Sequence, residues 1–301
     1  MTPTAQAKTS RLLPYEDLFR PSEAFDIIVR SSDQVDFPVH STILAIASPV
    51  LRDLIRIHGP NLSVVADFVE LVETSRTLGS LLSYCYPGWF IPPSNPMDTW
   101  LLWEAARRYG LRDLERMLMV QVLPQFVETS PLDVFAFACF FRQEKQAKLA
   151  AQGALSHPFP KDRLRLTDST QTASYHRLLT YHDESSQLVV DHVVKVWRLR
   201  AKRRYAFVGS EKCPCDTQGG GCPSKSWWDD FVGRASSSLR ERPHRLAVAG
   251  FEFLRPSFVI AARCEVCEPI ALGDLERGSE SLGRWVEKST WHIAKRTTFC
   301  P

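Results

Sequence analysis

Five of the eight cysteines gather in two short stretches, and closely spaced thiolates are the side chains best suited to hold a metal here. Cys264 and Cys267 have the C-x2-C spacing with which two thiolates reach one zinc ion, and zinc prefers four tetrahedral ligands. In the other stretch, Cys213 and Cys215 are closer together than the C-x2-C spacing. The pair that binds zinc there is therefore either Cys215 with Cys222 or Cys213 with Cys222. The sequence thus predicts a structural zinc site drawn from Cys213, Cys215, Cys222, Cys264 and Cys267.

Two other interpretations of these cysteines are open. Five candidate thiols do not match a site of four ligands, and His244 is a substitute ligand. Without a metal, the thiols would be reduced and would pack as small hydrophobic side chains. A redox role for the Cys264–Cys267 pair is disfavoured, because no thioredoxin-like βαβ pattern surrounds it.

Catalytic motifs are missing from the sequence, so we predict no enzyme. It has neither H-E-x-x-H nor G-x-S-x-G, and Cys139 lies in a Phe-rich segment typical of a core. The segment 221–226 looks superficially like a phosphate loop, but Ser224 stands before Lys225 where that loop needs glycine. His40 sits at a strand–helix junction, where we expect a structural role. The structural zinc is the one cofactor that we consider.

Five cations lie within seven residues at Arg198, Arg200, Lys202, Arg203 and Arg204. They suggest a nuclear-import or nucleic-acid-binding patch, or the cationic C-terminus of a helix, where positive charge is favourable. We favour the helix terminus, because 37 basic residues are nearly balanced by 34 acidic ones and the net charge is only +3. Nucleic acid is therefore not an expected partner.

Composition indicates a soluble globular protein, with 44% hydrophobic and 24% charged residues among 301. The first ten residues lack the apolar run of a signal peptide, and no run of about 18 apolar residues could span a membrane. We expect an intracellular protein, nuclear or cytoplasmic. Its cysteines would then be thiols or metal ligands rather than disulfides.

The N-terminal elements form a recognisable order. Strands are predicted at 25–30 and 35–39, joined by the polar turn 31–34. Helical spacing starts at His40, and Ser48–Pro49 gives an N-cap and a first-turn proline for a second helix. A third strand at 62–68 precedes a helix from Ser75 that ends at Tyr86–Pro87–Gly88.

Helices dominate the rest of the chain. Asn95–Pro96 starts one that Gly110 ends, and its partner closes at Pro124. Ser130–Pro131 opens a longer helix that runs to Gly153, with Phe137, Phe140 and Phe141 on its buried side. Further predictions are helices within 160–205, a helix capped by Ser226, a short helix begun by Pro256, and an amphipathic stretch with Leu275, Leu282, Trp285 and Val286.

The order of these elements resembles a BTB/POZ domain. The residues that carry the resemblance are Asp26, the His40–Leu44 step, Ser48, the Tyr86–Pro87 helix end and the stretch 104–111. The helical tail is similar to the extension of a group of fungal BTB-domain proteins. The resemblance implies an α+β fold in which a short sheet is capped by helices and followed by a mostly helical extension. We divide the chain into a flexible N-terminus 1–20, a BTB/POZ domain 21–128, a helical extension 129–205 and a cysteine-containing module 206–301.

The resemblance implies a protein–protein interaction module that self-associates, commonly through its first helix, and that works as a scaffold or adaptor. Some members are substrate adaptors of cullin-type ubiquitin ligases, and others are transcription-associated regulators. In the repressor type, the counterpart of Asp26 and a basic residue line a charged pocket, but Ser41 stands at the basic position here. The hydrophobic-x-acidic motif of ligase adaptors is also missing from His58–Leu62. We therefore expect a homodimer with an unidentified protein partner, and a cullin scaffold only as an alternative.

The zinc hypothesis predicts one zinc ion per chain, released by a thiol-modifying reagent because the ligands are thiolates. Elemental analysis of the purified chain, before and after the reagent, measures it. A chain that carries no zinc would end the hypothesis.

Overall fold

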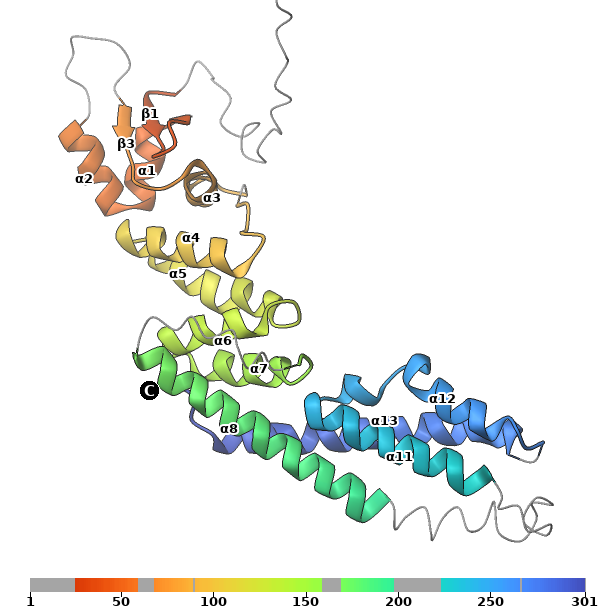
Figure 1. Ribbon diagram of the computed structural model, residues 1–301. Helices are drawn as coiled ribbons and strands as arrows, with labels where there is room; N and C mark the ends of the chain where they lie inside the picture. Colours follow the sequence, from red (N-terminus) through yellow and green to blue (C-terminus); the bar gives the residue numbers. More distant parts are fainter. Residues whose placement is uncertain are drawn as a thin grey trace, which may run out of the picture. The chain divides into compact units, whose positions relative to one another are not determined.

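The structure, a computed structural model, describes residues 25–58, 68–88, 90–158, 169–197, 223–265 and 267–300. The chain divides into two compact units, Met1–Phe126 and Val127–Pro301, each with its own core (Figure 1). The predicted α+β class is confirmed, with one small sheet and many helices. In the part of the chain that is described, no helix combines the length and apolarity needed to cross a membrane.

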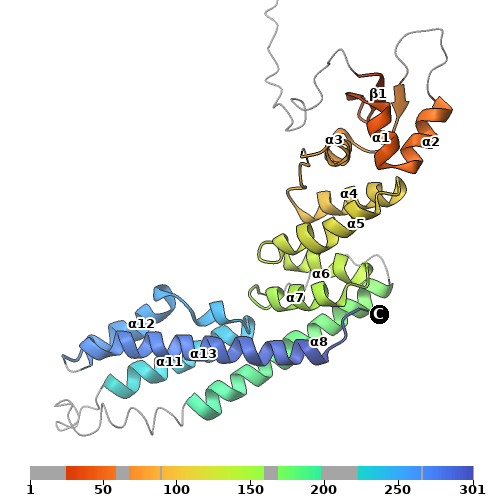
Figure 2. The same ribbon diagram turned by 180° about the vertical axis from the view of Figure 1, so that it is seen from behind.

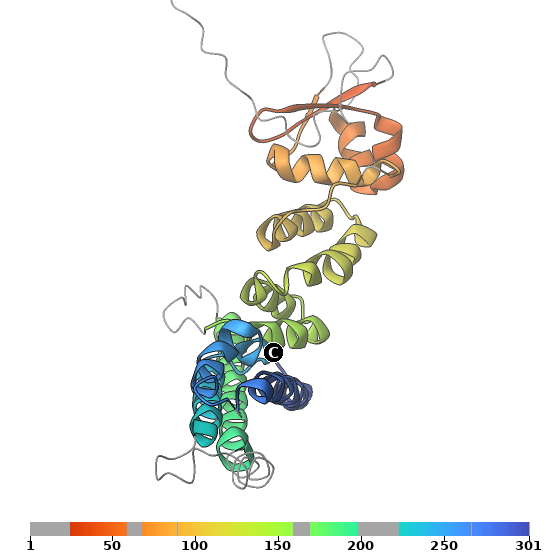
Figure 3. The same cartoon turned by 90° about the vertical axis from the view of Figure 1, so that its right-hand side faces the viewer.

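A three-stranded sheet opens the N-terminal unit (Figure 3). Strand β1 (Ile27–Arg30) lies in the middle, antiparallel to β2 (Asp36–Val39) and parallel to β3 (Phe68–Glu70). Ile27 pairs with Val39 and Val29 with Phe37, and all four side chains are buried. The alternation of apolar and polar residues therefore buries one face of the hairpin, as the sequence predicts.

Helices pack against the sheet in the same unit and supply most of its core. They are α1 (Ser41–Ala47), α2 (Pro49–His58), α3 (Ser75–Cys85), α4 (Pro96–Arg108) and α5 (Arg112–Met117). Asn95 caps α4, since its side chain accepts from the amide of Asp98 at 2.9 Å. Gly110 follows α4 with a φ of +71°, a conformation that glycine adopts without strain.

Two N-terminal predictions need correction. The partner helix does not close at Pro124: α5 continues as a π-helix, Leu118–Val122, and a 3-10 helix, Leu123–Phe126, that contains this proline. The third strand runs over Phe68–Glu70, later than the predicted 62–68, of which residues 62–67 lie outside the described part. Its pairing with β1 sets these bounds, and that pairing is not visible in local propensity.

The helix predicted from Ser130 to Gly153 is two helices, α6 (Pro131–Phe140) and α7 (Glu144–Ala154). Arg142 lies between them with a φ of +55°, and this left-handed backbone interrupts the helix. The prediction that Phe140 faces the core was wrong, since its side chain is 48% exposed, while Phe137 and Phe141 are half-buried. The buried residues of α6 include Val134, Phe135, Ala138 and Cys139. The residues of α6 itself are apolar on all sides of the helix. The hydrophobic periodicity therefore could not show which face is buried.

The C-terminal unit continues with long helices (Figure 2). They are α8 (Ser169–His192) with a π-helical end (Val193–Trp197), α11 (Pro223–Glu241), the 3-10 helix η5 (Arg245–Val248), α12 (Phe251–Ala261) and α13 (Glu268–Arg296). Two predicted helix starts are wrong, because α11 begins at Pro223 rather than after Ser226, and Pro256 lies inside α12. Pro256 is the sixth residue of α12, past its first turn, so it removes one backbone hydrogen bond of the helix and does not mark its first residue.

One hydrophobic cluster joins α8, α11, α12 and α13. Trp197 stacks on Trp228 with ring centroids 6.0 Å apart, and Trp228 lies against Gly278, where a Cβ atom would come within 3.0 Å of the ring. The predicted boundary at 205/206 falls in the range 198–222, outside the described residues, as does the cluster of five cations. The described helices on the two sides of this range share the cluster.

Side chains hold the last residues of the C-terminal unit. The carboxylate of Glu144 accepts from the amides of Phe299 and Cys300 at 3.1 and 2.9 Å. Arg177 donates to the carbonyl oxygens of the same two residues. The Phe299 ring is fully buried, edge-on to Phe135 and Tyr181. These contacts satisfy backbone groups that no helix or strand pairs.

Candidate functional site

The start of α1 is fixed by the carboxylate of a residue that precedes the first strand. Asp26 precedes β1, and the β1–β2 pairing brings it to the first residue of α1. The Ser41 amide donates to one Asp26 oxygen at 2.7 Å, and the Ser41 hydroxyl donates to the other at 2.5 Å. Burial of Asp26 opposes ionisation, but the hydrogen bonds from Ser41 outweigh it and lower the pKa of this carboxyl. Asp26 therefore acts as a helix cap whose partner is Ser41, at the position where a charged pocket would need a base.

A second aspartate caps α3 in the same way. Asp33, in the turn between β1 and β2, accepts from the amide and the hydroxyl of Ser75, both at 2.7 Å. Its pKa is also lowered, because hydrogen bonds from Ser31 and Ser75 outweigh the opposing effect of burial. Sequence reasoning missed this pair. The one local sign is that Thr74, the N-cap residue of α3, makes no capping bond with its side chain, and this cannot be seen in the sequence.

His40 connects α1 to the end of α3. The hydroxyl of Tyr86 accepts from the His40 amide and lies 3.0 Å from the ring nitrogen Nδ1. The rings also meet edge-on, with centroids 5.9 Å apart. His40 is thus fixed at the start of α1 by its backbone and ring contacts with Tyr86.

A residue with a buried carboxylate, Glu73, connects three segments of the unit. Glu73 follows β3, and its side chain is only 4% exposed. One oxygen accepts from the Tyr109 hydroxyl at 2.5 Å, and the other pairs with Arg108 at the end of α4. The Glu73 carbonyl accepts from the Ser32 amide in the hairpin turn at 2.9 Å. Burial, and then the bond to Glu73, raise the pKa of Tyr109, which keeps its hydroxyl protonated as the donor.

Ser48 extends this network to α2. Its hydroxyl donates to the Tyr109 carbonyl at 2.5 Å and accepts from the Leu51 amide at 3.0 Å, so it caps α2 while it holds the end of α4. Ser48 is fully buried, and so is Leu44 on the inner side of α1. Of the predicted motif residues, Asp26, His40 and Ser48 each fix a helix terminus and Leu44 packs in the core.

The outer side of α1 exposes Thr42 and Ile46. Ile46 is 81% exposed, and Ile43 and Ala47 are half-buried beside it. Val50, in the first turn of α2, extends the row and is 37% exposed. We call Ile43, Ile46, Ala47 and Val50 the α1 face. Ile46 and Val50 are the exposed members of this face.

The cysteines are only partly covered by the described residues. Cys264 and Cys267 are buried in the C-terminal cluster, and the Cys267 amide donates to the Cys264 carbonyl at 3.0 Å. Cys213, Cys215 and Cys222 lie outside the described part. Among the residues that are described, no group of three or more His, Cys, Asp or Glu side chains could hold a metal ion. The zinc site, with His244 as its substitute ligand, stays a prediction.

Cys139 shows no sign of nucleophilic chemistry. It is buried in α6, and burial raises the pKa of its thiol to about 11. A nucleophilic cysteine instead needs a lowered pKa.

Comparison with protein families supports the order of elements described above. A model of the BTB/POZ domain matches residues 15–123, which include the sheet, α1 to α5 and the α1 face. A search among curated proteins found no match. The match covers the N-terminal unit and leaves the C-terminal helices unassigned.

The two aspartate caps predict a pH dependence of stability. Their folded pKa values lie below the ordinary 3.8, so their contribution is complete above that pH and is lost as the pH falls through the folded values. Calorimetric unfolding of the full chain should show a midpoint that falls as the pH drops below about 4, and less steeply with Asp26→Asn and Asp33→Asn combined. Asp53→Asn, at an exposed position on α2, is the control and should keep the wild-type slope. An unchanged slope in the double variant would refute the capping role.

Proposed function

Because residues 15–123 belong to the BTB/POZ domain family, we propose that this protein is a non-enzymatic interaction module that self-associates through the α1 face. The exposure of Ile46 carries the proposal. An isolated subunit would leave this isoleucine in water on a helix whose inner side is already packed in the core. A second copy would cover it in a two-fold contact, in which the same surface serves both subunits.

The chemistry beneath the α1 face favours an apolar contact over a charged one. Asp26 already accepts two hydrogen bonds from Ser41, so its carboxylate has partners within its own chain. The aliphatic side chains of Ile43, Ile46 and Val50 are what α1 and the start of α2 offer to a partner. Burial of such side chains contributes about 25 cal/mol for each Å² of apolar surface.

An adaptor role in a cullin-type ubiquitin ligase is the alternative that the architecture supports. The interaction domain is followed by a separate compact unit, an arrangement that an adaptor needs in order to bind two partners. Binding of purified cullin to the full chain would distinguish it from self-association alone. A transcription-associated role rests only on the cations at 198–204, and we do not favour it.

The α1 face predicts that Ile46→Asp weakens dimerisation at least about tenfold, because each interface would bury two carboxylates without partners. Sedimentation equilibrium on the full chain at tens of micromolar should show a dimer for the wild type and a monomer for the variant. Ile57→Asp is the matched control, since Ile57 is 73% exposed on α2 but is not part of the α1 face. A monomeric wild type, or an Ile46→Asp dimer as stable as the wild type, would contradict the proposal.

A further inference from the structure

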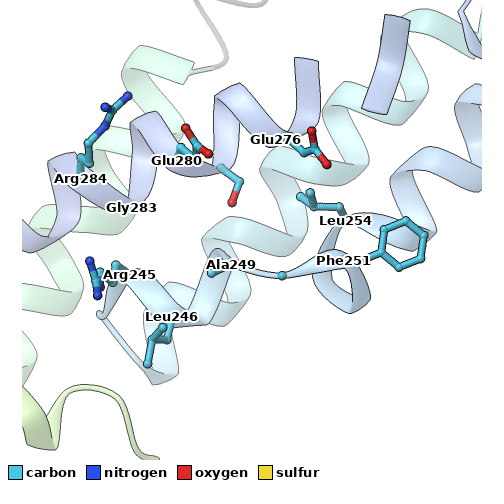
Figure 4. A pocket seen from close by; sticks show the side chains of 11 residues that line it. Arg245, Leu246, Ala249, Phe251, Leu254, Glu276, Glu280, Gly283 and Arg284 are labelled. Carbon is cyan, nitrogen blue, oxygen red and sulfur yellow. The ribbon is translucent and has the colours of Figure 1, made fainter. Parts of the chain in front are cut away.

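A groove runs through the C-terminal unit between α13 and the segment from η5 to the first turn of α12 (Figure 4). Its volume is about 450 Å³, within the range of about 300–1,000 Å³ typical of ligand sites. Buried Leu254 lines it, and Ala249 and Gly250 form its wall opposite α13. Two large apolar side chains stand at its edges, Leu246 at 61% exposure and Phe251 at 53%.

Charge is divided between the ends of the groove. Arg245 and Arg284 lie at one end on the two sides of Gly283, while Glu276 lies at the other end near Leu254 and Phe251, and Glu280 lies between (Figure 4). Within the described chain, Arg284, Glu276 and Glu280 make no ion pair, although Glu280 and Arg284 are one helical turn apart. Arg245 is paired only at its exposed edge, with Glu287 at 3.5 Å.

The backbone closes the basic end and leaves the middle open. A Cβ atom on Gly283 would lie 3.5 Å from Cβ of Arg245, so α13 and η5 are in contact there. A Cβ atom on Gly250 would meet nothing within 4 Å, which places open space beside it. Gly250 is also the N-cap of α12 and has no side chain to accept from the first amides of the helix. Such amides are satisfied by other acceptors, including carbonyl oxygens of a ligand.

We propose that this groove binds a short extended peptide segment of a partner protein, with an acidic residue at the arginine end, apolar residues in the middle and a basic residue at the glutamate end. The opposite charges at the two ends select the charges of the ligand. The apolar wall contacts the aliphatic side chains of the peptide. The amides at the start of α12 favour a ligand with main-chain carbonyl groups over a pure hydrocarbon. The proposal goes beyond self-association and does not depend on it, because the groove lies wholly in the C-terminal unit.

Fluorescein-labelled synthetic peptides with an Asp-Leu-Leu-Lys core in a Gly/Ser frame test it, by fluorescence anisotropy with the full chain. We expect this core to bind about tenfold more tightly than Asp-Leu-Leu-Asp or Lys-Leu-Leu-Lys cores, since each of those places one charge against its like. An Asp-Ser-Ser-Lys core should lose binding, because it has nothing for the apolar wall. Equal binding of all four peptides, or of none, would overturn the proposal.

Variants of the groove separate this site from general stickiness. Arg284→Glu should weaken the Asp-Leu-Leu-Lys core about tenfold and strengthen the Lys-Leu-Leu-Lys core, because the arginine end loses its positive excess. Ala249→Trp, at an exposed position, should block both by filling the groove. Arg255→Glu is the matched control, an exposed charge reversal on α12 that does not line the groove. Wild-type binding by Arg284→Glu and Ala249→Trp, with normal circular dichroism, would refute the site.

Discussion

The N-terminal unit depends on one buried carboxylate. Glu73 lies just after β3. Its charged carboxylate is buried away from water, and its partners are Tyr109 and the half-exposed Arg108. A buried charge of this kind is tolerated only when its partners are in place. The hairpin turn reaches the same residue through Ser32, and α2 reaches it through Ser48 and the Tyr109 backbone. Glu73, through its carboxylate and its backbone carbonyl, and the Tyr109 carbonyl therefore link the sheet, α2 and α4.

The surface that we assign to self-association follows from this internal satisfaction of polar groups. Asp26 and Asp33 hold the first residues of α1 and α3, and Tyr86 holds His40. Asp26, Asp33 and His40 thus have hydrogen-bond partners within the unit, and Leu44 fixes the inner side of the helix in the core. On its outer side, α1 exposes Ile46 beside Thr42.

Local signals predicted those parts of the fold that local physics determines. The hairpin, the Asn95 cap and the Gly110 helix end follow from alternation, a capping side chain and a left-handed residue. The failures occurred where tertiary contacts decide. The break at Arg142 follows the apolar residues of α6, and Pro256 is accommodated inside a helix. The Asp33–Ser75 and Glu73–Tyr109 pairs join residues 42 and 36 apart, and neither spacing carries a sequence signal. The groove likewise exists only because η5 and α13 lie side by side in the fold. Its lining residues therefore carry no signal in the sequence, unlike the closely spaced cysteines.

The importance of Glu73 is tested most directly by a double-mutant cycle with Glu73→Gln and Tyr109→Phe. The free energy of opening is read from native-state hydrogen exchange of the buried α4 amides in the full chain, so that it reports the N-terminal unit alone. If the carboxylate holds α4 to the sheet, the two residues should show a coupling free energy of about 1–2 kcal/mol, as expected for a buried hydrogen bond to a charged group. Additive effects, with a coupling within about 0.3 kcal/mol of zero, would contradict it.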